Sequence, residues 1–107
     1  MTLEPGRIRH TVVFALREPD AAVDFLAAAQ RLSAIPGVEA FEILDEVSPK
    51  NGYRYGISME FAGQDAYDAY NAHPDHVRFV QERWLPEVAD FLELDYAYRL
   101  RPPGPTA

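Results

Sequence analysis

Alternation of apolar and polar positions marks four segments of the chain as strands. The clearest is "RIRHTVVFALR" at residues 7–17, where every second side chain falls on one face. The members of that face are Ile8, His10, Val12, Phe14 and Leu16. The opposite face also carries apolar groups, so the pattern predicts a central strand.

Three more strands are predicted at "VEAFEILDEV", "YRYGISMEFA" and "FLELDYAYRL", residues 38–47, 53–62 and 91–100. In the first of these, alternation places Phe41, Ile43 and Val47 on one face.

Helical spacing replaces alternation between the first two strands. Apolar residues recur at i, i+3, i+4, i+7 and i+10, which is typical of one helix face. These residues are Phe25, Ala28, Ala29, Leu32 and Ile35. Asp20 is predicted to be the N-cap, and Pro36-Gly37 is predicted to end the helix.

The second helical region is interrupted by a proline. "QDAYDAYNA", residues 64–72, predicts a short helix with a packing stripe of Ala66, Tyr67 and Tyr70. Pro74 disfavours helical backbone at His73 and suits the first position of a new helix. That helix should run through residues 75–85, and Pro86 should break or kink it. Its predicted apolar stripe consists of Val77, Val80 and Trp84, with His76 beside it.

The resulting order is β-α-β-β-α-β, with the second helix in two pieces. This order predicts an α+β, ferredoxin-like fold with one antiparallel sheet and helices on one face. Residues 7–98 form the predicted domain, between a flexible tail at 1–6 and a Pro-rich tail at 99–107. Residues 1–6 and 102–107 should contribute little to stability. The other sheet face still carries large side chains, which a second copy of the chain could cover in a homodimer.

Charge and composition exclude several classes of partner and bound group. The 107 residues carry a formal net charge of −7 and include no cysteine. Disulfides and thiolate metal sites are therefore excluded, and we expect a reducing, cytoplasmic location. An acidic chain is a poor partner for nucleic acid or anionic membrane surfaces. No apolar run has the length of a membrane span, and the first residues lack the pattern of a signal peptide.

The stretch "YNAHPDHVRF", residues 70–79, is the candidate for chemistry. Tyr70 and His76 flank the joint at Pro74, so both could face one cavity. At the first turn of a helix, His76 should stay neutral and could act as a general base. Tyr70 could donate a hydrogen bond to a carbonyl oxygen on which charge builds, with no metal or organic cofactor. The alternative is structural: Tyr70 continues the packing stripe and His76 covers a helix end.

Three other residues, His73, His10 and Tyr55, can each be interpreted either as structural or as part of a site. His73 and His76 could bind a metal, but no third ligand is evident, so we predict no metal and a capping role for His73. His10 is either a core histidine bonded to a neighbour or a pocket-lining group. Tyr55 belongs to an aromatic stripe that would suit a core, a dimer interface, or a pocket for a planar or alkyl ligand.

Several of these stretches together resemble the stress-responsive A/B barrel (Dabb) domain family. The matching stretches are "IRHTVVFAL", "IPGV", "VSPKNGYRYGISMEF", "AYNAHPDHVRFV" and "LELDY", within about residues 7–98. The resemblance implies a dimeric α+β barrel, in which two ferredoxin-like sheets close on each other. A plant branch of the family contains a polyketide cyclase that works by an aldol reaction. Its catalytic tyrosine and histidine match Tyr70 and His76, its strand-1 histidine matches His10, and Tyr55 replaces a further pocket histidine.

Three functions follow as hypotheses. The first is a homodimer with a pocket for a small apolar or aromatic ligand, without assigned activity. The second is a cofactor-free cyclase or isomerase, in which His76 and Tyr70 are catalytic and His10, Tyr55 and His73 line the pocket. The third is a cofactor-free monooxygenase of the related dimeric barrel families, which would consume oxygen.

Overall fold

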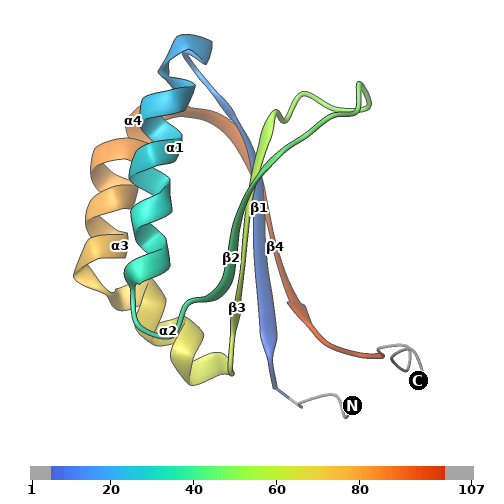
Figure 1. Ribbon diagram of the computed structural model, residues 1–107, viewed down its shortest axis with the longest axis vertical. Coiled ribbons are helices and arrows are strands. Elements are labelled where there is room, and N and C mark those ends of the chain that lie inside the picture. Colours follow the sequence, from blue (N-terminus) through green and yellow to red (C-terminus); the bar gives the residue numbers. More distant parts are fainter. Residues whose placement is uncertain (1–5, 101–107) are drawn as a thin grey trace, which may run out of the picture.

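The computed structural model describes residues 6–100 and contains one four-stranded antiparallel sheet (Figure 1). The strands are β1 (Ile8–Leu16), β2 (Glu39–Asp45), β3 (Tyr55–Phe61) and β4 (Val88–Ala97), and the sheet order is β2-β3-β1-β4. The predicted ferredoxin-like α+β fold is thus confirmed, with β1 inside the sheet and β4 at one edge.

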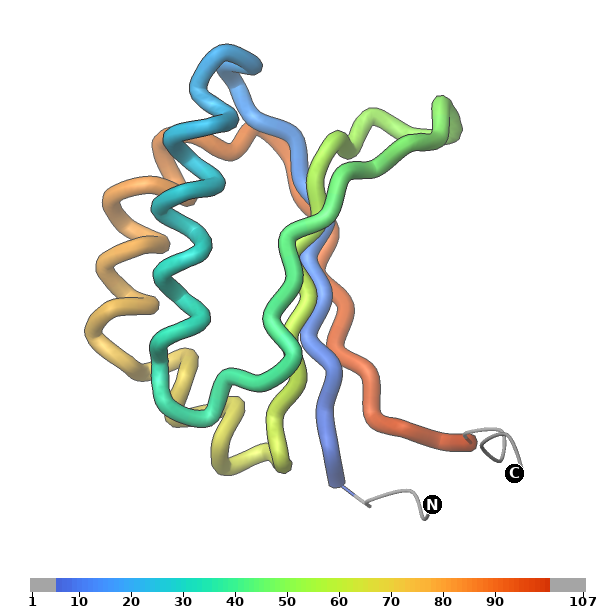
Figure 2. Tube along the Cα trace, viewed as in Figure 1, coloured from blue at the N-terminus to red at the C-terminus, as the bar shows by residue number. Residues whose placement is uncertain are grey.

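The helices form a single layer on one face of this sheet (Figure 2). The first helical segment combines a 3-10 turn (Pro19–Ala21), α1 (Ala22–Gln30) and a second 3-10 turn (Arg31–Ala34). The second combines α2 (Gln64–Ala72), α3 (Pro74–Phe79), a π-helical turn (Val80–Trp84) and α4 (Leu85–Glu87). The opposite sheet face has no helix over it within residues 6–100.

The core lies between this helical layer and the predicted inner face of β1. Ile8, His10, Val12 and Phe14 are all buried, and the side chains between them are less so. In the register, His10 lies between Met59 of β3 and Asp95 of β4. The next inward position, Val12, lies between Ile57 and Glu93. The pairing therefore places two carboxylates of β4 on the helix-covered face.

The first helical segment corrects one prediction. The stripe itself is found, since Phe25, Ala29, Leu32 and Ile35 are buried. Asp20, however, is not an N-cap: Glu18 precedes the 3-10 turn, Ala21 precedes α1, and neither makes a side-chain capping bond. The reason is Pro19, whose fixed φ starts helical backbone two residues early and places Asp20 inside the first turn.

Strand β2 is shorter and less regular than its alternation suggests. Ala40 has a φ of +48°, and the pairing register with β3 shifts between Glu39 and Glu42. Phe41, within this irregularity, and Ile43, after it, both pack against the core, as expected. Val47 does not share their environment, because it lies beyond the end of the strand and is 92% exposed.

The joint at Pro74 is confirmed, but the stripe after it is shifted. His73 has extended backbone, with φ −64° and ψ 135°, and Pro74 is the first residue of α3. Phe79 is buried, whereas Val77 is 40% exposed. The stripe that continues from His76 at helical spacing passes through Phe79 and Val80, so Val77 lies at its margin. The helix ends one residue after Pro86, and β4 follows at once with Val88, three residues earlier than expected.

The predicted tails fall largely outside the described range, which omits residues 1–5 and 101–107. The prediction that trimming both tails leaves stability nearly unchanged therefore stays a prediction. Within residues 6–100, no helix has the length and hydrophobicity needed to cross a membrane.

Candidate functional site

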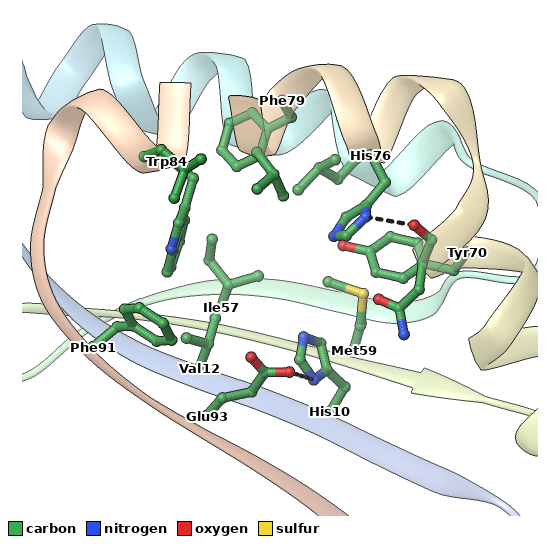
Figure 3. Close-up of a pocket in the computed structure, with 14 residues that line it drawn as sticks. His10, Val12, Ile57, Met59, Tyr70, His76, Phe79, Trp84, Phe91 and Glu93 are labelled. Atoms are coloured by element: carbon green, nitrogen blue, oxygen red, sulfur yellow. Dashed lines mark hydrogen bonds and ion pairs between the residues drawn. The ribbon is translucent and has the colours of Figure 1, made fainter. Parts of the chain in front are cut away.

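A cavity of about 270 Å³ lies between the sheet and the second helical segment (Figure 3). Its floor comes from β1, β3 and β4, and its roof comes from α2, α3 and the π-helical turn. One end is aromatic, with Phe79, Trp84 and Phe91. The other end holds polar side chains, among them His10, Tyr70 and His76. A ligand with an apolar body and a polar group would match this division.

Tyr70 and His76 meet in the roof of the cavity, with ring centroids 4.5 Å apart. The Tyr70 side chain is buried, and its hydroxyl lies beside the His76 ring (Figure 3). This hydroxyl makes no hydrogen bond to another residue within 6–100. It is nevertheless open to the cavity, because every fully buried side-chain polar atom in that range has a partner.

The phenol of Tyr70 is held in its protonated form. Burial, and secondly the negative charge of Glu93, raise the pKa of Tyr70. The hydroxyl therefore keeps its proton at neutral pH and is available as a hydrogen-bond donor to a ligand.

A backbone carbonyl sets the tautomer of His76. Its Nδ1 lies 3.1 Å from the carbonyl oxygen of Asn71. A carbonyl only accepts, so Nδ1 carries the proton, and Nε2 of the neutral ring keeps its lone pair. Burial lowers the pKa of His76, and nearby His10 also lowers it. A lowered pKa keeps the ring neutral at neutral pH, and burial is the largest cause of the shift.

His10 lies on the floor opposite this pair and belongs to a hydrogen-bonded cluster. Its Nδ1 is 2.6 Å from Oδ1 of Asp95. The Tyr67 hydroxyl donates to both carboxylate oxygens of Asp95, at 2.9 Å each, and lies 3.1 Å from His10 Nδ1. Burial raises the pKa of Tyr67, and the bond to Asp95 adds to this effect. Both interpretations of His10 therefore apply, because it is a bonded core histidine and it also lines the cavity.

Two residues predicted to line the pocket do not line this cavity. Tyr55 packs on Phe14, with centroids 5.8 Å apart, beyond the aromatic end. His73 caps α3, since its Nδ1 accepts a hydrogen bond from the Asp75 N–H at 3.1 Å. The predicted capping role of His73 is thus found, and the cap holds its ring at the joint and not in the cavity wall.

The sequence alone does not identify Glu93 and Asp95 as site residues, although a signal is present. Alternation along β4 places Phe91, Glu93 and Asp95 on one face. Their position beside His10 depends on the register with β1, which no local pattern in "FLELDYAYRL" reveals.

The same residues form the one group with possible metal-ligand geometry in the described range 6–100. His10, Glu93 and Asp95 each offer one ligand atom, and these atoms lie within 4.8 Å of one another. Hydrogen bonds among His10, Asp95 and Tyr67 already satisfy most of these atoms, so we assign no metal here. The Nδ1 atoms of His73 and His76 each have a separate backbone partner, which gives this pair different roles.

A helix-covered antiparallel sheet with a cavity beneath the broken second helix defines a ferredoxin-like α+β protein. Residues 8–98 match the model of the stress responsive A/B barrel domain, Dabb, and the chain belongs to this family. The resemblance noted in the sequence is thereby confirmed.

Solved and curated relatives agree with this assignment. The chain is similar to a Dabb family protein of ferredoxin-like fold from Mesorhizobium loti, with 53% identity and a TM-score of 0.81 over 92% of this chain and 99% of that one. A dimeric ferredoxin-like protein of unknown function from Thermobifida fusca has 23% identity and a TM-score of 0.75, over 92% and 96% of the two chains. A stress-response A/B barrel domain-containing protein of Arabidopsis thaliana is 23% identical over 83% of this chain, and the match spans only 36% of that longer protein.

Proposed function

We propose that this Dabb protein is a homodimer that binds a small apolar or aromatic molecule in the cavity beneath α2 and α3. The observation that carries the proposal is the Tyr70 hydroxyl, which has no protein partner within residues 6–100 and faces an otherwise largely apolar cavity. Since no described residue accepts a hydrogen bond from it, this donor is available to water or a ligand. A ligand that replaces such water with its own acceptor keeps the hydrogen bond and adds apolar contact. The ligand would therefore place a carbonyl or hydroxyl oxygen near Tyr70 and an apolar body near Trp84.

The dimer is supported by the open face of the sheet. Leu92, Leu94 and Tyr96 of β4 are exposed there, and Leu44 of β2 lies on the same face. These residues lie on the two edge strands of the sheet, and exposed apolar side chains gathered on one face are typical of a protein interface. The name of the Thermobifida fusca relative describes a dimer of the same fold, which supports the proposal. We expect the interface to exceed roughly 1,200 Å² in total, the lower bound for stable complexes.

Ligand binding can be tested through Trp84, the single tryptophan of the chain, which lines the cavity. Aromatic ketones and alcohols of increasing size should quench or shift its fluorescence with saturation. Tyr70→Phe should weaken binding of the ketones, because it removes the donor and leaves the shape of the cavity. A saturable response that is unchanged in Tyr70→Phe would contradict the assigned role of the hydroxyl.

A second function, catalysis of proton transfer, is supported by the tautomer of His76. With Nδ1 held by Asn71, Nε2 can accept a proton from a carbon next to a ligand carbonyl. Tyr70 would donate to the carbonyl oxygen as enolate charge develops, and the carbanion could then attack a second carbonyl in an aldol cyclisation. No described residue of the site specifically supports the monooxygenase hypothesis, which oxygen consumption would test.

Proton transfer can be measured without knowing the natural substrate. Ketones that bind should exchange their α-hydrogens for deuterium in heavy water faster in the presence of the protein, as followed by NMR. His76→Asn should abolish the acceleration, because the Asn amide can still donate to Asn71 but offers no basic nitrogen. Equal exchange rates with and without the protein would leave ligand binding as the function.

A further inference from the structure

We propose that Glu93 makes this cavity selective for charge, so that it admits cationic and uncharged aromatic ligands and rejects carboxylates. The inference rests on the proposed ligand-binding function of the same cavity and adds the chemical class of the ligand. Glu93 is not among the site residues expected from the sequence. Its side chain lines the cavity from β4, the edge strand (Figure 3).

The position of Glu93 lets it act on a ligand. Its side chain is 47% exposed, so it reaches the solvent while it also lines the cavity. One carboxylate oxygen is 3.9 Å from His10 Nδ1 and 3.4 Å from the Tyr67 hydroxyl. Across residues 6–100, no lysine or arginine forms an ion pair with it. Among the described residues, its charge is therefore not compensated by a permanent cation, and it remains available to a ligand.

The rest of the cavity strengthens this negative field. No lysine or arginine from the described part of the chain lines it. A second carboxylate, that of Asp95, lies two residues farther along the same face of β4. It is hydrogen-bonded to His10 and Tyr67. In a partly enclosed site of lower dielectric constant, a carboxylate repels an anionic ligand more strongly than it would in water. An acid would also have to enter without any counter-charge from these lining residues.

The aromatic end of the cavity is suited to a cation as well. Phe91 lies on the same face of β4 as Glu93, two residues away, and packs edge-on against Trp84 with centroids 5.5 Å apart. Aromatic faces attract ammonium groups, and a neighbouring carboxylate adds to that attraction. A ligand with an aromatic ring and a protonated amine can therefore contact Trp84, Phe91 and Glu93 together.

The test uses three probes of one size: benzylamine, benzyl alcohol and benzoate. Each is titrated against the intact protein at neutral pH, with Trp84 fluorescence and calorimetry as readouts. We expect the amine to bind most tightly and the acid most weakly. In Glu93→Gln the ratio between amine and acid should fall by roughly fivefold to tenfold, as for a partly screened charge. Glu18→Gln removes the same charge at an exposed position outside the cavity and should leave the ratio unchanged.

The outcomes separate this inference from the function on which it rests. If amine and acid bind equally to the unmodified protein, or if Glu93→Gln leaves their ratio unaltered, the charge selectivity is wrong and ligand binding stands. If none of the three probes binds to any variant, the proposed binding of small aromatic molecules is itself contradicted. Even if Glu93→Gln folds poorly, the comparison of probes on the unmodified protein can still overturn the proposal, because equal binding of amine and acid would contradict it.

Discussion

At the scale of single residues, backbone groups determine what the histidines of the second helical segment can do. The Asn71 carbonyl holds the proton of His76 on Nδ1, and the Asp75 N–H occupies Nδ1 of His73. Two histidines only three positions apart therefore have different roles, one at the cavity and one at a helix cap. The cap is predictable from sequence, because Pro74 fixes the backbone at His73. The partner of His76 is not, since it depends on the packing of α3 against α2.

The lowered pKa of His76 predicts how stability depends on pH. In the unfolded chain the ring binds a proton in the ordinary histidine range, whereas burial keeps it neutral to lower pH in the folded protein. The unfolded state then binds more protons, so the free energy of unfolding should fall as pH drops from above the ordinary histidine pKa toward the lowered folded value. Thermal unfolding of the wild type and His76→Asn across that range would reveal this contribution. As pH drops, the wild type should lose more stability than the variant. Melting temperatures that fall in parallel with pH would contradict the lowered pKa.

Two buried tyrosines offer a matched pair of residue-scale substitutions. The Tyr67 hydroxyl donates to Asp95, whereas the Tyr70 hydroxyl has no partner in the described part of the chain. Tyr67→Phe should therefore lower the free energy of unfolding by about 0.5–1.5 kcal/mol, the usual net contribution of a hydrogen bond. Tyr70→Phe should leave it nearly unchanged. Denaturant unfolding of both variants measures the difference, and an equal loss in both would show that Tyr70 has a structural partner.

At the scale of secondary structure elements, local patterns are informative where one face is buried throughout. Alternation in β1 places His10, Val12 and Phe14 on the inner face, as the structure has them. The pattern fails at Val47 because β2 ends at Asp45, before the alternation of the sequence does. The helical pattern fails at Val77 because two overlapping sets of residues have helical spacing in this segment. Packing against the sheet selects the set that contains His76 and Phe79. The neighbours of β4 are unpredictable for a different reason, since register is a property of two strands together.

The turn between α1 and β2 provides a prediction at this scale. Gly37 has a φ of +90°, a conformation that side chains disfavour, and an added Cβ would lie 3.6 Å from that of Ala66. Gly37→Ala should therefore destabilise the protein by about 1 kcal/mol or more, chiefly through backbone strain. Gly52, in the turn before β3, has no atom within 4 Å of its added Cβ and no positive φ. Gly52→Ala should be nearly neutral in the same thermal unfolding experiment; equal melting temperatures for the two variants would refute the strain.

At the scale of the whole molecule, the two faces of the sheet are suited to separate functions. The helix-covered face holds the core and the cavity, and the open face carries Leu92 and Leu94 beside Val13 of β1. The cavity on one side and the proposed interface on the other share no side chains, so each can change independently of the other. Substitutions on the open face should therefore alter assembly while the cavity keeps its lining residues.

The proposed dimer gives the prediction that tests this division directly. Leu94 is 39% exposed on the open face of the edge strand β4, and it pairs with Thr11 of the inner strand β1. Leu94→Glu would place a charge inside the proposed interface, where it has no partner, so it should weaken association by several kcal/mol. Light scattering should then report a mass near the 12.1 kDa of one chain instead of twice that value.

A charge on the helical side serves as the control for this substitution. Val23→Glu introduces the same charge at an 85% exposed position on α1, outside the sheet, and should remain dimeric. Both variants should still quench Trp84 fluorescence with the same ligands if the cavity is independent of the open face. A wild type that is monomeric at micromolar concentration would disprove the dimer. A Leu94→Glu variant that stays dimeric would place the interface away from the β4 side of the open face, because a buried, unpaired carboxylate there could not be accommodated without a large loss of affinity.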